Sequence, residues 1–226
     1  MQLTLSDKDF DYLDSNKKEF VKTVLPIIIN ENQNILMIRS FVNELKGKLE
    51  TFRTLNNNEI RKLNDIAQKY NIKYQNKHKL DLVDEILSNV DVIPNSIVLA
   101  QAAIESGWGK SRFAKEYNAL FGEYTYDDSE GVIPLERENG DTHLIKAFSS
   151  YSNSVESYFD NINSHYAYED FRDIRNIMRK RNNFSNVNLL VNKLSTYAED
   201  ENYIKTIRQV IKTNNFEIFD QKTISY

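Results

Sequence analysis

The spacing of apolar residues along this chain predicts a mainly helical protein with one β-hairpin. Apolar residues recur every three to four positions from Phe10 to Phe52, which predicts a long amphipathic helix over residues 8–52. The same spacing predicts further helices over residues 59–70, 80–90, 152–162, 171–181, 187–196 and 200–211. The polar residues 56–58 can cap the second helix, and the residues from Asn214 onward are expected to form a fraying tail.

Residues 94–122 contain the most apolar helix of the chain. Between residues 97 and 104 only Gln101 is polar, and a helix that is apolar on every side is normally buried on every side. Pro94 suits the first turn of a helix, and Asn95 or Ser96 is expected to cap its free amide groups. This segment is therefore predicted to be the centre of the core.

An acid stands at the end of this apolar helix. At about 100° per residue, Gln101, Glu105 and Trp108 fall on one stripe, so Glu105 is expected beside an indole, with Gly107 and Gly109 just beyond it. A structural interpretation is a buried glutamate neutralised by a cation or bonded to the turn. A functional interpretation is a general acid whose pKa is raised by desolvation against an aromatic wall. Periodicity does not separate the two.

Five of the six glycines lie close together in the middle of the chain, where a hairpin is also predicted. The stretch GVIPLERENGDTHLIKAF carries Asn139-Gly140, a pair that favours a two-residue type I′ turn. Such a turn pairs Leu135 with Leu144 on one face, and Glu136 with His143 on the other. The polar face of the hairpin can then line a binding site.

Composition excludes several classes of protein. With 226 residues, 40% of them apolar, the chain is long enough for one large domain or a domain with an appendage. Its net charge of −4 argues against a nucleic-acid partner. The absence of cysteine excludes disulfides and thiolate chemistry, and the three histidines have no metal-ligand spacing, so neither a metal nor a cofactor is expected. No apolar run approaches about 18 residues, so no transmembrane segment is expected. The N-terminus lacks the apolar core of a signal peptide.

The stretch AQAAIESGWGKSRFAKEYNALFG resembles the signature of the glucosaminidase family of peptidoglycan hydrolases, glycoside hydrolase family 73, and most closely its Bax-type members. The resemblance extends more loosely from Val92 to the end of the chain, with a fainter likeness over residues 20–38. It implies a lysozyme-like domain over residues 92–226, preceded by a helical region, residues 1–91, that packs on it. It also places Glu105 at the position of the catalytic acid.

Most glycosidases use a second carboxyl group. LERENG resembles a segment of the flagellar-rod members of the family and puts Glu136 in that role. If the hairpin register slips, the substitutes are Glu130, Glu138 and Asp141. The acetamido oxygen of the substrate could replace a second carboxylate, and this needs a group that holds the acetamide. YAEDENY resembles a Tyr-Ala-x-Asp segment of the family, which assigns that role to Tyr197, with Tyr203 as its neighbour on a helix face.

The remaining candidate substrate-binding residues surround the predicted acid; they are Gln101, Trp108, Asn118, Phe121, Tyr124 and Tyr126. NALFG resembles the family segment that closes the floor of the cleft, although Asn118 can instead bond turn backbone and Phe121 can instead serve packing. Tyrosines 124 and 126 offer faces on which sugar C–H groups bury well. Trp108, the only tryptophan, suits a wall behind Glu105.

The expected function is hydrolysis of the β-1,4 bond between N-acetylglucosamine and N-acetylmuramic acid. Glycan strands of peptidoglycan are the expected partner, the protein is expected to be a monomer, and the family implies a periplasmic, envelope or secreted location. Three alternatives stay open: a muramidase or lytic transglycosylase on the same polymer, a catalytically silent glycan-binding scaffold, and an enzyme for a host or chitin-like glycan.

Overall fold

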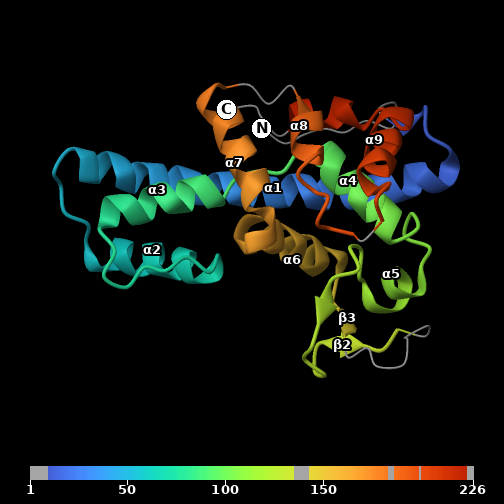
Figure 1. Ribbon diagram of the computed structural model, residues 1–226, viewed down its shortest axis with the longest axis horizontal. Coiled ribbons are helices and arrows are strands. Elements are labelled where there is room, and N and C mark those ends of the chain that lie inside the picture. The colour runs from blue at the N-terminus through green and yellow to red at the C-terminus, as the bar shows by residue number, and fades with distance from the viewer. Residues whose placement is uncertain (1–9, 135–142, 183–185, 199, 223–226) are drawn as a thin grey trace. The chain divides into compact units, whose positions relative to one another are not determined.

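The computed structural model describes residues 10–134, 143–182, 186–198 and 200–222, and these are mainly helical (Figure 1). The helices are α1 (Ser15–Glu50), α2 (Asn57–Lys69), α3 (Lys79–Asn89), α4 (Asn95–Glu105), α5 (Arg112–Tyr117), α6 (Tyr151–Ser164), α7 (Glu169–Lys180), α8 (Val187–Val191) and α9 (Tyr203–Thr213). Two 3₁₀ segments are η2 (Tyr166–Tyr168) and η3 (Phe216–Lys222), and the strands are β1 (Tyr124–Thr125), β2 (Gly131–Val132) and β3 (Leu144–Lys146). The predicted mainly helical α+β class is confirmed.

Local sequence explains where the first helices begin and end. The predicted helix over residues 8–52 is observed as α1, which is 36 residues long and includes Pro26. At the start of α2, the Asn56 side chain accepts a hydrogen bond from the Glu59 amide at 3.0 Å, and the Glu59 carboxylate accepts one from the Asn56 amide at 2.8 Å. This reciprocal pair is a capping box, so the predicted cap is confirmed.

The strands form a three-stranded antiparallel sheet in the order β1-β3-β2, whereas the sequence predicted a hairpin alone. Val132 pairs with Ile145, whereas the register set by an Asn139-Gly140 turn would place Ala147 there, so the predicted register is two residues off. A methyl group on Gly131 would lie 2.4 Å from Leu144 Cβ, so the observed register leaves no room for a side chain at this position. The predicted turn itself, and Glu136 with it, lie outside the described residues.

The chain divides into two compact units that do not follow its order. Unit 1 takes the described residues within 1–30, 94–158 and 207–226, and unit 2 takes those within 31–93 and 159–206. Sequence analysis placed a boundary after residue 91, between segments that are continuous in the chain. Each compact unit draws residues from both sides of that position, and the predicted domain boundary stays a prediction.

The core of unit 1 surrounds α4, whose residues from Asn95 to Ala103 are all buried. The prediction of a helix buried on every side is therefore confirmed. The segment η3 packs on α4 with Phe216 and Phe219 fully buried, and the ring of Phe10 lies 5.8 Å from that of Phe219. The prediction of a fraying tail after Asn214 is wrong, because these two aromatic side chains anchor the segment in the core.

The core of unit 2 lies among α2, α3 and α7. Helices α2 and α3 lie side by side, and α3 also packs on α7 (Figure 1). Asp91, directly after α3, is buried and forms ion pairs with Arg179 of α7 and Arg39 of α1. Arg175 of α7 has no exposed surface and donates to the carbonyls of Asn89 and Asp91. The C-terminal end of α3 is thus held by three arginines.

Candidate active site around Glu105

Glu105 is the last residue of α4 and is half-buried. The chain turns sharply after it, through Gly107, Trp108 and Gly109, which all have positive φ angles, of 56°, 59° and 72°. The Ser106 hydroxyl fixes this turn by donating to the Ala102 carbonyl at 2.5 Å and accepting from the Gly109 amide at 2.8 Å. Two of the three left-handed positions are glycines, which adopt that conformation without steric penalty. The turn ends the helix at its acid.

The carboxyl group of Glu105 faces the backbone of Gly122. A Cβ atom at Gly122 would lie 3.8 Å from Glu105 Oε2, and Gly122 has a positive φ of 63°. The segment that carries Gly122 is held by α6, because Ser154 Oγ accepts from the Leu120 amide at 3.1 Å and the Phe121 ring stacks on Tyr158 at 4.2 Å. The acid therefore lies close to the backbone of a glycine, in a segment that is bonded to α6.

Gln101 precedes Glu105 by four residues in α4, and Phe121 directly precedes Gly122. Gln101 is 0% exposed and its Oε1 accepts a hydrogen bond from the Tyr158 hydroxyl at 2.5 Å. Phe121 is only 2% exposed. In this structure neither side chain has surface to offer a substrate, and Phe121 packs in the core, which is the alternative that the sequence left open; a contact of either residue with substrate stays a prediction.

Trp108 does not continue the predicted helical stripe. Helix α4 ends at Glu105, so the 3.6-residue period stops before the tryptophan. Its ring packs edge-on against Phe20 at 5.7 Å and against Phe216 at 6.1 Å, and the Lys17 ammonium lies 5.0 Å from its centre. The stripe prediction is wrong, and the observed ring contacts of the indole anchor the turn after α4 on α1 and η3.

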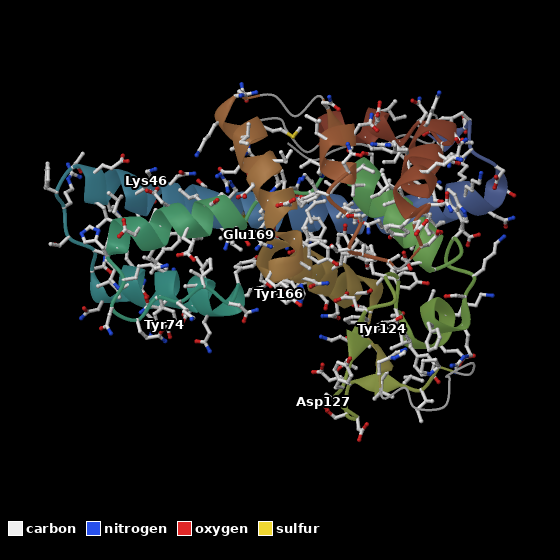
Figure 2. The ribbon with its side chains drawn as sticks, in the orientation of Figure 1. Lys46, Tyr74, Tyr124, Asp127, Tyr166 and Glu169 are labelled. Carbon is white, nitrogen blue, oxygen red and sulfur yellow. The ribbon has the colours of Figure 1, made fainter. Side chains whose placement is uncertain are left out.

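Of the other predicted substrate-binding residues of unit 1, Asn118 has a structural role, whereas Tyr124 and Tyr126 lie on the surface. Asn118 ends α5 in the left-handed conformation and donates to the Phe148 carbonyl at 3.0 Å, which is the turn role that the sequence left open. Tyr124 and Tyr126 are 64% and 78% exposed, and the Tyr124 ring stacks on His143 at 4.3 Å. Figure 2 marks Tyr124 on its short strand. These two tyrosines are available to a ligand.

Glu123 is a carboxylate near the acid that sequence analysis missed. It follows Gly122 directly, its Oε2 accepts from the Ser157 hydroxyl at 2.9 Å, and its carbonyl accepts from the Lys146 amide at 2.8 Å. Its place immediately after NALFG was the signal that could have identified it. Of the predicted second carboxylates, Glu130 is exposed and pairs with Lys146 at 3.5 Å. The others, Glu136, Glu138 and Asp141, lie outside the described residues.

Tyr197 and Tyr203 belong to unit 2. Their rings stack almost in parallel, 5.8 Å apart with 2° between planes. Tyr203 is 4% exposed, whereas Tyr197 is half-buried. The two are therefore neighbours, and the role of Tyr197 next to Glu105 stays a prediction.

The N-terminus of α4 is capped by Asp220 of η3. Oδ1 of Asp220 accepts from the Ser96 amide at 2.7 Å and Oδ2 from the Ser96 hydroxyl at 2.6 Å, while the Asn95 side chain donates to the Phe219 carbonyl at 2.8 Å. The prediction that Asn95 or Ser96 caps this helix is wrong, since both lie inside its first turn. Burial raises the pKa of Asp220 to about 6, although the bonds from Ser96 lower it.

The last two observations concern metal binding and membrane crossing. Among the described residues, no group of three or more histidine, aspartate or glutamate side chains is placed to hold a metal ion. None of the described helices combines the length and apolar character that crossing a membrane requires.

These features define a glycosidase-like domain, and the chain belongs to the glucosaminidase family. The family's sequence profile, described as mannosyl-glycoprotein endo-beta-N-acetylglucosaminidase, matches residues 80–216. The expected family is thereby confirmed.

Among individual proteins, the chain is similar to protein bax of Escherichia coli, with 32% identity over 184 residues. That alignment covers 80% of this chain and 63% of bax. The chain is also similar to the peptidoglycan hydrolase FlgJ of Escherichia coli, with 35% identity over 92 residues, which cover 36% of this chain and 29% of FlgJ. The fold matches the catalytic domain of the autolysin Auto of Listeria monocytogenes, with a TM-score of 0.51, 16% identity, and coverage of 97% of this chain and 100% of that one.

Proposed function

We propose that this chain cleaves the β-1,4 bond between N-acetylglucosamine and N-acetylmuramic acid in peptidoglycan, with Glu105 as the general acid. Membership of the glucosaminidase family and similarity to a peptidoglycan hydrolase support the substrate and the reaction. The observation that carries the role of Glu105 is its geometry: a half-buried carboxyl at the end of a buried helix, facing the side-chain-free backbone of Gly122.

In the proposed reaction Glu105 donates its proton to the glycosidic oxygen as the bond to the anomeric carbon breaks. The positive charge that develops on the sugar is stabilised by Glu136 or by the acetamido oxygen of the substrate. Tyr197 holds that acetamide or orients the water that completes hydrolysis. The family supports action in the cell envelope or outside the cell, and we propose that the protein acts there as a monomer on glycan strands.

The test is mass spectrometry of purified sacculi digested with the wild type and with Glu105→Gln. We expect new reducing N-acetylglucosamine ends with the wild type and a loss of at least about 100-fold in rate with the variant, because general-acid catalysis contributes about 10²–10⁴-fold. Glu116→Gln is the matched control, since Glu116 is an exposed acid of α5 in the same unit.

The products also separate the alternatives. Anhydro-muramic ends would identify a lytic transglycosylase, and reducing muramic ends a muramidase. Binding to sacculi without any cleavage by the wild type would identify a glycan-binding scaffold. Equal rates for Glu105→Gln and Glu116→Gln would remove Glu105 from the mechanism.

A further inference from the structure

A series of aromatic rings in unit 2 runs from buried to exposed positions. Neighbouring ring centres lie 5.8, 6.2, 6.0 and 4.4 Å apart in the order Tyr203, Tyr197, Tyr168, His165 and Tyr166. Tyr203 and Tyr168 are 4% and 6% exposed, whereas Tyr166 is 80% exposed. The residue that the family resemblance assigns to substrate, Tyr197, is therefore linked through ring contacts to a surface tyrosine that it does not assign.

The exposed end of this series stands on a rigid base. The buried Arg172 donates to the His165 carbonyl at 2.8 Å and to the Ile162 carbonyl at 3.1 Å. The His165 ring is fixed in turn, because its Nδ1 accepts from the Ala167 amide at 3.2 Å. A ligand that stacks on Tyr166 would therefore meet a backbone that is already ordered, and little conformational entropy would be lost on binding.

The loop that carries Tyr197 is tied to the same base. The Thr196 hydroxyl donates to the Ala167 carbonyl at 3.3 Å, and Lys193 forms an ion pair with Asp170 at 2.8 Å. Thr196 and Tyr166 are both exposed, so an aromatic face and a hydroxyl belong to one surface. Such a combination suits a sugar, whose C–H face buries on a ring while its hydroxyls make hydrogen bonds.

The charges next to Tyr166 select among the sugars of the polymer. Glu169, Asp170 and Asp173 are exposed in the first turns of α7. Among the described residues two cations interact with them, Lys193, which pairs with Asp170, and the buried Arg172, whose charge interacts with Glu169 and Asp173, so three acids stand against two cations. Figure 2 shows Tyr166 and Glu169 close together in the same unit. Acidic neighbours disfavour the carboxylates of muramic acid and of its peptide, so the uncharged N-acetylglucosamine is the better occupant.

We propose that Tyr166, supported by His165, forms an additional subsite that stacks an N-acetylglucosamine unit of the same glycan strand beyond the sugar held at Tyr197. This proposal rests on the proposed function. It predicts that the subsite contributes only for strands long enough to reach it.

The experiment measures binding of muramidase-generated, uncrosslinked glycan strands of defined length to protein that carries Glu105→Gln, so that hydrolysis does not interfere. We expect Tyr166→Ala in that background to weaken binding of long strands about 5- to 10-fold, as expected for loss of one aromatic stacking contact. A disaccharide should bind equally to both proteins. Tyr166→Phe should bind long strands as the parent does, because it keeps the ring.

Phe52→Ala is the matched control, since Phe52 is 98% exposed in the same unit. If Tyr166→Ala and Phe52→Ala bind long strands equally well, the subsite does not exist, although the proposed function stands. If Tyr166→Ala weakens the disaccharide as much as the long strand, a separate subsite is excluded too. If the wild type neither cleaves sacculi nor binds strands of any length, the proposed function fails, and the subsite fails with it.

Discussion

One helix in each unit has an end that is stabilised by charged side chains from distant parts of the chain. In unit 1, Asp220 bonds the first turn of α4 across a sequence separation of 124 residues. In unit 2, Arg39 donates to the carbonyls of Leu87 and Val90, and Arg175 to those of Asn89 and Asp91, around the end of α3. The signs agree with the helix dipole, since an anion favours the N-terminus and cations favour the C-terminus.

The two caps differ in how they respond to pH. Burial raises the pKa of Asp220 to about 6, so this carboxyl changes charge in the mildly acidic range. Burial lowers the pKa of Arg175 to about 9, so this guanidinium stays charged at neutral and acidic pH. Unit 1, which carries Glu105, therefore has a capping carboxyl that titrates near pH 6, whereas Arg175 in unit 2 keeps its charge over the same range.

The largest expected effect on stability comes from replacing Arg175, the fully buried arginine at the end of α3. Arg175→Ala should lower the free energy of unfolding by about 4 kcal/mol, because it leaves buried carbonyls without donors and opens a cavity. Arg175→Met, which keeps much of the volume, should lose less. Urea denaturation followed by far-UV circular dichroism measures both. Equal losses would show that packing contributes little and that hydrogen bonding dominates the cap.

A smaller loss of stability is expected when Asp91, which pairs with Arg39 and Arg179, is neutralised. Asp91 accepts from Arg179 at 2.8 and 2.5 Å and lies 3.4 Å from Arg39. Asp91→Asn should lower the free energy of unfolding by about 3 kcal/mol, because the arginines lose their counter-charge in a buried setting. Asp84→Asn is the control, since its ion pair with Lys46 is largely exposed (Figure 2 labels Lys46). A loss no greater than that of the control would contradict the cluster's role.

The sequence predicted the two helices that are capped, but not the distant residues that cap them. The buried helix α4 and a cap from residues 56–58 follow from local patterns, and both were predicted correctly. The cap from Asp220 joins residues 124 positions apart, and no periodicity records such a contact. The region after Asn214 was expected to fray because its polar residues hide how deeply Phe216 and Phe219 are buried.

In the candidate site, too, local sequence patterns did not reveal contacts between distant elements. Glu105 was found because a carboxylate that ends an apolar helix is unusual, and its motif resembles a known family. Gln101 and Trp108 were assigned to substrate from helical spacing, which does not tell a residue that faces a ligand from one that faces a neighbouring helix. The observed contacts of these residues, to Tyr158 and to Phe20, come from other elements. Glu123 was missed because no local pattern marks it; its bond to Ser157 joins residues 34 positions apart.

The titration of Asp220 should be visible in the stability of the protein. Because the folded-state pKa is raised, its contribution is fully present below about pH 4 and is lost as the pH rises through about 6. Asp220→Asn removes this dependence, so the free energy of unfolding of the wild type relative to the variant should fall by on the order of 2 kcal/mol between pH 4 and pH 7.5. Urea denaturation of both proteins at several pH values tests this. A constant difference would show that Asp220 does not titrate in this range.

Glu217 also bears on this pH dependence, because its charge helps raise the pKa of Asp220. Glu217 is exposed, so Glu217→Gln should reduce the slope only slightly, since solvent screens its charge. A slope that vanished in Glu217→Gln would instead make the charge pair, and not burial, the main cause.

Ser96→Ala isolates the hydroxyl bond between α4 and Asp220, and its expected effect is smaller than that of replacing Asp220 itself. Ser96→Ala removes the bond from the Ser96 hydroxyl to Asp220 Oδ2 but keeps the bond from the Ser96 amide to Oδ1. We expect a loss of about 1 kcal/mol in the free energy of unfolding, typical of one cap hydrogen bond. In the Asp220→Ala background the same substitution should cost almost nothing, because its partner is gone. Equal costs in the two backgrounds would mean that the serine acts through packing, and the bond from the Ser96 amide would then be the only one of its two bonds to Asp220 that contributes.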